Sequence, residues 1–415
     1  MSVIAASSSE PSAVKREDPI AQMLLAGQLI AATLLQKVAI TLTADIQLFL
    51  GFIILTGLTG FGVLAGRLEI RAMRCVVYLI AMSVMALVQL AHSGDFSFPS
   101  LIMLMLVHLP YVFGLRSGLV NPGYELNFYL RLMSVFAVVG IVQFFAQYVV
   151  GVPVAFFMEH YFPKSFYVIG FNGLNPLGGG AEHFKSTGVF FLEPAIFCQF
   201  LALAVIIDVV YFMNVKRIIL LLAAIAVTFS GTGLILLFLL MPFYLIERRQ
   251  FFLLTGAGVA VALSPLWAPL VGLGRFVNRA GEFFDPHSSG FARFVSMFLV
   301  LRDFVLPYPH KMLFGEGAGM IGAIVPRAVD YANFDPTWGK IIYEYGFFAA
   351  TAYFLFLATL FTTARRSRYL KAALLIQFLV LGGYIIPPTI HGLIVALIVW
   401  PDARPVPVAI ERKSA

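Results

Sequence analysis

Charged residues are scarce in this sequence. Asp, Glu, Lys and Arg make up 12% of the 415 residues, about half of their share in an average soluble protein. Hydrophobic residues make up 60%, more than the core of a soluble protein of this length buries. They form long runs without the alternation of period two that a membrane β-barrel requires. The composition excludes a soluble enzyme and a disordered chain, and it predicts an all-α polytopic membrane protein.

Cysteine is nearly absent as well. Cys75 and Cys198 lie far apart in apolar runs, which favours neither a disulfide framework nor a CxxC metal pair, so we expect both to be core residues.

The sequence also lacks the P-loop, GxSxG and HExxH patterns. A formal GxGxxG within residues 315–322 has no βαβ unit around it and indicates a tight backbone turn. We therefore expect neither a cofactor nor a metal.

Long apolar runs cover most of the chain. Two of them, 218–246 and 372–402, are too long for one crossing and are interrupted by residues 230–233 and 382–388, so we expect each to form two short helices. The other runs suit one crossing each; they are residues 20–41, 46–66, 75–92, 98–115, 128–150, 189–213, 251–271 and 340–363. The sequence thus predicts about twelve transmembrane helices in a single domain, 20–402, between tails 1–19 and 403–415.

The positive residues between the runs support this count. They fall on one side only if both interrupted runs are helical hairpins, and the positive-inside rule makes that side the cytoplasm, with both tails. Lys37, within the first run, is the exception, and we expect its side chain to extend toward the outer interface. Because orientation signals account for most of the net charge of +7, we expect no nucleic-acid partner.

Two long segments, 151–188 and 272–339, are left on the outer side. The second carries a basic cluster where the rule predicts few cations; its members are Arg275, Arg279, Arg293, Arg302, Lys311 and Arg327. This excess predicts an anionic partner. The alternative is pairing within the segment, whose acids are Glu282, Asp285, Asp303, Glu316 and Asp330.

Two residues of opposite charge stand out near these segments. Glu193 follows Lys185 and lies just inside the outer end of a run, where a carboxylate needs a partner or a function; the alternative is a helix-start acid beside Pro194. A helix that begins near Ser288 would place Arg293 in its second turn, where its guanidinium can bind phosphate or carboxylate in a fork. The alternative for Arg293 is an ion pair with an acid of its own segment, Asp285 or Asp303.

The last candidates surround the start of the run 340–363. Lys340 and Glu344 are four residues apart and can meet on one helix face. Asp335 before Pro336 has the form of a helix N-cap followed by proline at the first helical position. Capping is therefore the alternative to a chemical role for Asp335.

Several segments, taken in order, resemble the Wzy polymerase and O-antigen ligase superfamily of bacterial envelopes. The resemblance covers residues 185–346; it rests on Thr187-Gly188 with Glu193-Pro194, Phe229-Ser230-Gly231-Thr232-Gly233, Ser289-Gly290 with Arg293, Leu313-Phe314-Gly315-Glu316-Gly317 and Glu344-Tyr345-Gly346. It implies transfer of a saccharide from a polyprenyl pyrophosphate, without metal or nucleotide, at the outer face of the bacterial inner membrane. The implied partners are the lipid-linked oligosaccharide and membrane lipid, with a chain-length regulator and export proteins as candidates.

The resemblance also implies roles for the candidate residues. Arg293, helped by Arg302, Arg279 or Lys185, would stabilise the negative charge that grows on the departing pyrophosphate. Lys340 and Glu344 are the other expected substrate-binding residues. Asp335 would accept the proton of the acceptor hydroxyl, with Glu193 as the alternative base. Family ligases have an arginine where this chain has Gly231 and Thr232, and a histidine where it has Asp335, so a polymerase is favoured. A ligase and a lipid-linked oligosaccharide flippase are the alternatives.

Overall fold

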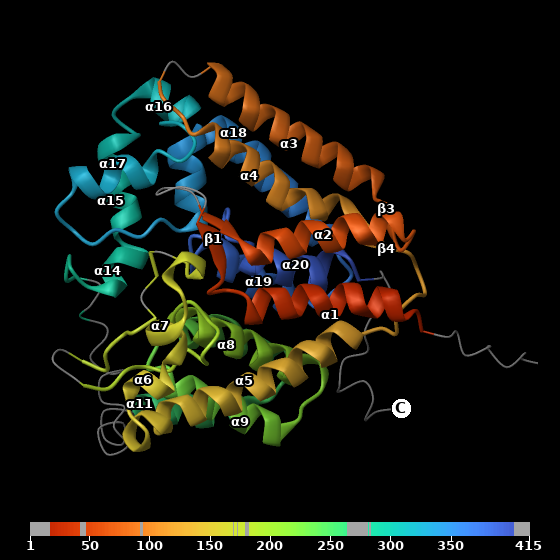
Figure 1. Cartoon of the computed structure of the whole chain (residues 1–415), viewed down its shortest axis with the longest axis vertical. Helices are drawn as coiled ribbons and strands as arrows, with labels where there is room; N and C mark the ends of the chain where they lie inside the picture. Colours follow the sequence, from red (N-terminus) through yellow and green to blue (C-terminus); the bar gives the residue numbers. More distant parts are fainter. Residues whose placement is uncertain are drawn as a thin grey trace, which may run out of the picture.

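The computed structural model describes residues 17–41, 47–91, 94–168, 170–171, 173–178, 182–263, 281 and 284–401. These residues are mostly helical, with two small antiparallel sheets (Figure 1). The candidate Arg279 lies outside the described residues.

The N-terminal third contains the two sheets and five long helices. The helices are α1 (Pro19–Leu34), α2 (Leu50–Leu64), α3 (Ala72–Ala91), α4 (Phe98–His108), which a 3₁₀ turn η1 (Leu109–Val112) extends, and α5 (Tyr124–Val149). Strands β1 (Ala39–Thr41) and β2 (Gln47–Phe49) form one sheet, and β3 (Leu68–Ile70) and β4 (Phe113–Leu115) form the other.

The rest of the chain alternates long helices with short ones. The outer segment 151–188 contains α6 (Val152–Ala155), α7 (Phe157–Tyr161) and η2 (Lys164–Phe166). Helices α8 (Pro194–Tyr211), α9 (Val215–Val227), α10 (Thr232–Glu247) and α11 (Phe251–Ala262) follow it. The second outer segment contains α14 (Ser289–Phe294), α15 (Ser296–Phe304), α16 (Pro309–Phe314) and α17 (Ile321–Ala328), and the chain continues with α18 (Thr337–Thr363), α19 (Arg368–Leu379), α20 (Pro388–Ile394) and a π-helical turn η4 (Val395–Val399).

The predicted runs and the two predicted interruptions correspond to these helices. Each run contains an α-helix, and the interrupted runs divide between α9 and α10 and between α19 and α20. Among the described residues, α3, α5, α8 and α18 are long and apolar enough to cross a membrane, and shorter apolar helices accompany them. Cys75 and Cys198 are free, and Cys198 is buried. The chain is thus mostly helical, as expected of an all-α membrane protein.

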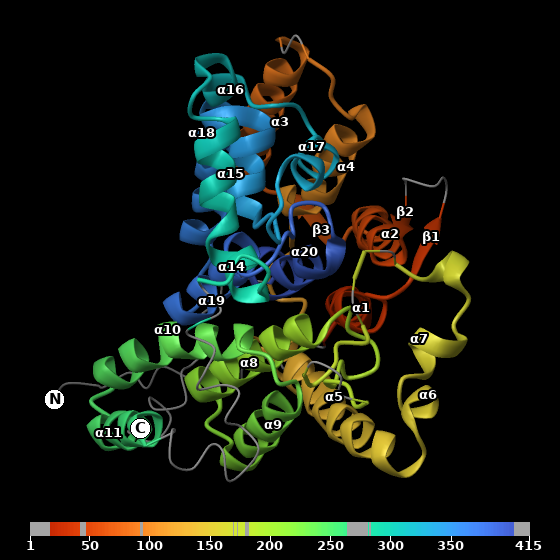
Figure 2. The same cartoon turned by 90° about the vertical axis from the view of Figure 1, so that its left-hand side faces the viewer.

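Helix α8 lies at the centre of the lower half of the molecule in Figure 2. Most of its surface is buried, and it packs against α5, α9, α10 and α19. Its residues are apolar around almost the whole circumference, as a helix enclosed by other helices requires. The start of α10 approaches α8 closely, because a Cβ at Gly233 would lie 2.3 Å from the carbonyl oxygen of Cys198. The core thus fixes the position of the first turn of α8.

Basic loops gather at one end of the bundle. Arg67, after α2, pairs with Asp18 before α1 at 2.8 Å. Arg366, after α18, pairs with Glu125 at the start of α5 at 2.5 Å and donates to the carbonyl oxygen of Leu397 at 3.1 Å. The loops that the charge pattern assigns to one side therefore lie together.

The predicted outer segments lie at the opposite end. The N–H of Ala318 donates to Gln89 Oε1, near the end of α3, at 2.7 Å, and the Gln89 amide donates to the carbonyl oxygen of Glu344 at 3.1 Å. Helix α3 separates these contacts from the basic loops by about 30 Å, at 1.5 Å per residue. Figure 1 shows α14 to α17 on one side of the molecule and β3 with β4 on the other.

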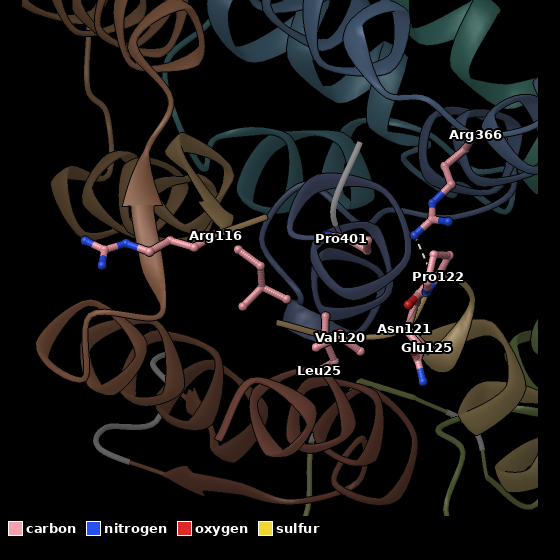
Figure 3. Close-up of a pocket in the computed structure, with 9 residues that line it drawn as sticks. Leu25, Arg116, Val120, Asn121, Pro122, Glu125, Arg366 and Pro401 are labelled. Atoms are coloured by element: carbon pink, nitrogen blue, oxygen red, sulfur yellow. Dashed lines mark hydrogen bonds and ion pairs between the residues drawn. The ribbon is translucent and has the colours of Figure 1, made fainter. Parts of the chain in front are cut away.

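A small pocket opens beside the basic end (Figure 3). It is lined by Leu25, Leu115, Arg116, Val120, Asn121, Pro122, Glu125, Arg366 and Pro401. The Arg366–Glu125 ion pair forms part of its wall. None of the predicted site residues lines this pocket.

Candidate functional site

An ion pair joins Arg293 and Glu193, two candidates that are 100 residues apart in the chain. Arg293 Nη2 lies 3.2 Å from Glu193 Oε2, and the side chains are 15% and 22% exposed. The Ser288 hydroxyl accepts a hydrogen bond from the N–H of Phe291 and caps α14, so Arg293 lies in the second turn, as predicted. The pairing of Arg293 with an acid of its own segment is wrong.

The start of α8 places the Glu193 carboxylate. Glu193 is the N-cap residue and Pro194 is the first helical residue, but the Glu193 side chain makes no capping hydrogen bond. Proline at this position costs no hydrogen bond, because the first amides of a helix have no intrahelical partner. The carboxylate lies at the positive end of α8, as the helix-start interpretation expects, and it contacts Arg293.

The second interruption of the chain, between α19 and α20, provides the other contacts of Arg293. Arg293 Nη1 donates to the carbonyl oxygen of Leu381 at 3.4 Å. The Arg293 guanidinium also lies over the ring of Phe334, 4.6 Å from the ring centroid, in cation–π geometry. Three chain segments thus hold one guanidinium, which leaves it less freedom than an exposed arginine has.

Buried polar side chains fix the turn between α19 and α20, residues 381–384. The Gln199 amide donates to the carbonyl oxygen of Leu381 at 3.2 Å, and the Tyr384 hydroxyl donates to Gln199 Oε1 at 2.9 Å. The Thr337 hydroxyl donates to the carbonyl oxygen of Gly382 at 3.0 Å and accepts from the N–H of Tyr384 at 2.9 Å. Gln199 and Tyr384 are not among the residues predicted from the sequence. Gln199 could have been found there, because it is a lone amide in the middle of the apolar run 189–213.

Asp335 lies next to the same turn, but it is not a helix cap. Helix α18 begins at Thr337, and Pro336 is its N-cap, so both the predicted cap and the predicted proline position are wrong. The Asp335 carboxylate lies 3.3 Å from Lys340 Nζ and is 35% exposed. Gly383 contacts its backbone, because a Cβ there would lie 2.8 Å from the carbonyl oxygen of Asp335. Asp335 and Arg293 therefore approach one turn, residues 381–384.

Lys340 connects Asp335 with Glu344. Lys340 Nζ lies 3.7 Å from Glu344 Oε1, which confirms the predicted contact on one helix face. The Glu344 side chain is 2% exposed and contacts the backbone N–H groups of Gly319 and Ile321. A direct contact of Glu344 with substrate stays a prediction, and its observed contacts are with the protein.

The glycine-rich segment 315–319 forms the tight turn that the sequence predicts. The N–H of Glu316 donates to the carbonyl oxygen of Tyr343 at 2.8 Å, and the N–H of Gly317 donates to that of Glu344 at 3.1 Å. A Cβ at Gly315 would lie 2.4 Å from the carbonyl oxygen of Glu344, so only glycine fits. At Gly346 the backbone of α18 adopts a φ of 71° and leaves the helical conformation. Two of the segments that carry the resemblance are thus in contact.

The remaining basic candidates lie in other surroundings. Arg302 on α15 is 65% exposed, and Asp303 accepts hydrogen bonds from its Nε at 2.6 Å and its Nη2 at 3.0 Å. Hydrogen bonding within this pair raises the pKa of Arg302 and lowers that of Asp303. Lys185 is partly buried, and its backbone N–H donates to the carbonyl oxygen of Asn175 at 2.9 Å.

Within the described ranges, no three His, Cys, Asp or Glu residues lie close enough together to hold a metal ion. No family model, curated protein or solved structure matches this chain. The chemistry of the site therefore has to be inferred from its own groups. These are a guanidinium in contact with one carboxylate, a second, partly exposed carboxylate, and a partly buried ammonium.

Proposed function

We propose that the protein polymerises polyprenyl-pyrophosphate-linked oligosaccharide units into a surface or secreted polysaccharide, by metal-independent glycosyl transfer at the outer face of the bacterial inner membrane. The observation that carries the proposal is that Arg293, which pairs with Glu193, and Asp335 approach one turn, residues 381–384, at one end of a helical bundle. A guanidinium that already pairs with a carboxylate has the right geometry for a phosphate oxygen as well.

The reaction forms one bond to the anomeric carbon and breaks another. The acceptor hydroxyl attacks the anomeric carbon, the bond from that carbon to the pyrophosphate oxygen breaks, and the pyrophosphate leaves with the bonding electrons. Arg293 stabilises the negative charge that grows on the leaving group. Asp335 takes the proton of the acceptor hydroxyl, since its carboxylate is partly exposed. Glu193 is the alternative base.

The proposed topology has twelve membrane crossings and both termini in the cytoplasm. The order of the helices and the gathering of basic loops at one end of the bundle support it. Reporter fusions test it directly. Fusions at Ser186 and Gly290 should report an outer location, and fusions at Arg249 and Arg366 a cytoplasmic one. A cytoplasmic Gly290 would contradict both the topology and the mechanism.

The first interruption favours a polymerase over a ligase. The Thr232 hydroxyl donates to the carbonyl oxygen of Ala195 at 3.0 Å, and Gly233 packs against the backbone of α8. This contact uses small residues where the resembled ligases have an arginine.

The decisive experiment incubates the purified protein in lipid vesicles with purified lipid-linked repeat units. A ladder of chain lengths supports the polymerase, product only with a lipid A core acceptor supports the ligase, and no product in either assay contradicts the proposal.

A further inference from the structure

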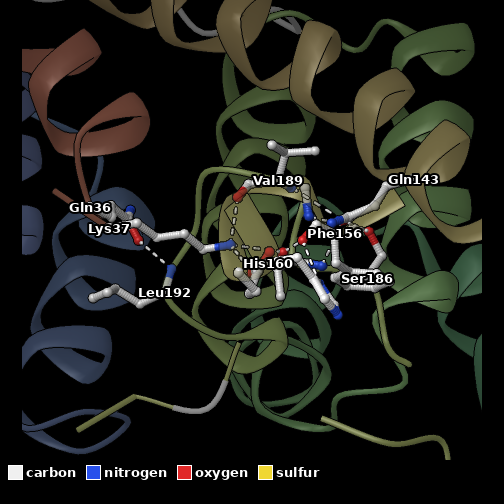
Figure 4. A network of polar contacts seen from close by, with 11 residues as sticks. Gln36, Lys37, Gln143, Phe156, His160, Ser186, Val189 and Leu192 are labelled. Carbon is white, nitrogen blue, oxygen red and sulfur yellow. Dashed lines mark hydrogen bonds and ion pairs between the residues drawn. The ribbon is translucent and has the colours of Figure 1, made fainter. Parts of the chain in front are cut away.

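Lys37 is completely buried. Its side chain extends toward the predicted outer segment 151–188, in the expected direction, but it ends in an ion pair and not at the membrane interface. Its Nζ lies 2.5 Å from Glu159 Oε1, and the two side chains are 0% and 6% exposed. Figure 4 shows the Lys37 side chain reaching from the end of α1 into a network of polar contacts. A buried ammonium costs several kcal/mol of desolvation unless its partners offset it. A buried ionisable group in such a chain therefore indicates a specific task.

The network holds the turn that precedes α8. Lys37 Nζ donates to the carbonyl oxygen of Val189 at 2.5 Å and to the Thr187 hydroxyl at 3.2 Å. From α5, Gln143 Oε1 accepts hydrogen bonds from the N–H groups of Thr187 at 3.0 Å and of Val189 at 3.2 Å. Residues from α5 and from the end of α1 thus fix the same few residues.

The turn is strained. Val189 has a φ of 67°, in the left-handed region, where a β-branched residue is an outlier. Such a conformation is unfavourable and persists only where the surroundings enforce it. Gly188 before it also has a positive φ of 59°, and a Cβ there would lie 2.8 Å from the ring of Phe197. Four residues after Val189 the chain reaches Glu193.

We propose that Lys37 is a positioning residue for Glu193, so that the buried Lys37–Glu159 pair determines how the start of α8 meets Arg293. The inference rests on the proposed function for its kinetic consequences, but not for the geometry. Lys37 acts by holding the carbonyl oxygen of Val189, which keeps the strained turn and hence the first residue of α8 in place. Gln36 adds to this, since its Oε1 accepts from the N–H of Leu192 at 3.4 Å.

The kinetic test uses a double variant, Lys37→Met with Glu159→Gln. It removes the ion pair without leaving a buried unpaired charge, so the protein should remain folded in the membrane. We expect kcat for saccharide transfer to fall about 10- to 100-fold, because a misplacement of about 1 Å has this effect. The KM for the lipid-linked substrate should change less than about threefold, because Arg293 remains to bind the pyrophosphate.

A matched control exists at the other end of α8. Asp208 is buried, and its Oδ2 lies 2.5 Å from Arg217 Nε. The double variant Asp208→Asn with Arg217→Gln removes an equally close ion pair, which joins the end of α8 to α9, and its kcat should stay within about twofold of the wild type. Equal losses in the two double variants would show a general loss of stability and overturn the proposal, as would normal kcat in the Lys37 double variant.

A readout without activity separates this proposal from the proposed function. Glu193→Cys and Arg293→Cys are combined with Cys75→Ser and Cys198→Ala, and a short bifunctional thiol reagent measures cross-linking. The yield should fall at least threefold when the Lys37 and Glu159 substitutions are added, and it should not change with the Asp208 and Arg217 substitutions. Activity is measured separately, on the wild type with its native Glu193 and Arg293. A lower cross-linking yield together with a wild type that has no transferase activity would refute the function and support the positioning role. An unchanged yield would refute the positioning role.

A milder variant keeps the test decisive if the double variant does not reach the membrane. Thr187→Val preserves the shape of the side chain and removes the hydroxyl that Lys37 Nζ contacts. We expect Thr187→Val to lower the cross-linking yield about threefold in the cysteine variant, and to lower kcat about threefold in the otherwise wild-type protein. An unchanged yield together with an unchanged kcat would overturn the proposal.

Discussion

Two arginine–glutamate pairs at opposite ends of the bundle differ in distance and exposure. Arg366 and Glu125 are 2.5 Å apart, with side chains that are 4% and 3% exposed. Arg293 and Glu193 are 3.2 Å apart, with side chains that are 15% and 22% exposed. The first pair is enclosed by protein, so exchange of its partners requires opening of the structure. The second pair is looser and reaches solvent, so an anionic substrate can compete for the guanidinium.

The comparison separates an ion pair that stabilises the fold from the ion pair that we propose to bind the substrate. Removing one partner of an enclosed pair leaves an uncompensated charge and should reduce stability. Removing one partner of the looser pair should reduce substrate turnover more than stability.

Substitution of Arg366 should have the largest effect. Arg366→Met leaves Glu125 buried without its cation, which should lower the free energy of unfolding by about 3–5 kcal/mol. Folded protein recovered in mild detergent, measured by size-exclusion chromatography at several temperatures, reports the change. The double variant Arg366→Met with Glu125→Gln should recover most of the stability. A single variant as stable as the wild type would contradict the structural role of this pair.

Substitution of Asp335 should abolish most of the polymer without loss of protein. Asp335→Asn removes the proposed base and should slow transfer by about 10²- to 10⁴-fold. The folded protein should be retained, because Asp335 does not cap α18. The ladder of chain lengths on a gel measures the effect, and Asp330→Asn in the same outer segment is the control. Near-normal ladders from Asp335→Asn would transfer the role of base to Glu193.

Arg293→Lys keeps the charge and loses the planar fork. We expect transfer to slow by about 10²-fold, in the range found when one preorganised donor to a developing negative charge is removed. Initial rates at saturating lipid-linked substrate give the value, with protein abundance measured on the same membranes. Normal rates would make Arg293 a structural cation of the outer segment.

Arg302→Lys should have the smallest effect. Arg302 is 65% exposed and already pairs with its neighbour Asp303, and exposed ion pairs contribute little to stability. We expect both the transfer rate and the stability to remain within about twofold of the wild type, measured in the same assays. A loss as large as that of Arg293→Lys would instead support the sequence-based prediction that Arg302 binds pyrophosphate.

The sequence predicts the helices well and the side-chain partners poorly. Apolar run length and the position of glycine and proline locate the helices and both interruptions, because these features act within about twenty residues. The contact of Lys340 with Glu344 is predictable for the same reason, since one helix turn sets their distance. The prediction for Asp335 fails although it is local, because Pro336 itself takes the N-cap position.

Long-range pairings explain the other failures. Glu193 lies 100 residues from Arg293, and Glu159 lies 122 residues from Lys37. No local pattern specifies such partners, so each residue could be nominated from its charge but not paired. The turn at 381–384 was predicted as a hairpin tip, and its role in holding Arg293 depends on the packing of α8, α14 and α18 around it.

Binding of polyprenyl pyrophosphate tests the central claim most directly, namely that Arg293 beside Glu193 forms the anion site of a saccharide polymerase. The wild type, Arg293→Lys and Arg302→Lys, each purified into lipid nanodiscs, are titrated with polyprenyl pyrophosphate that carries no sugar. We expect Arg293→Lys to raise the Kd at least tenfold and Arg302→Lys to change it less than about twofold. Equal Kd values for Arg293→Lys and the wild type would show that Arg293 does not bind the pyrophosphate.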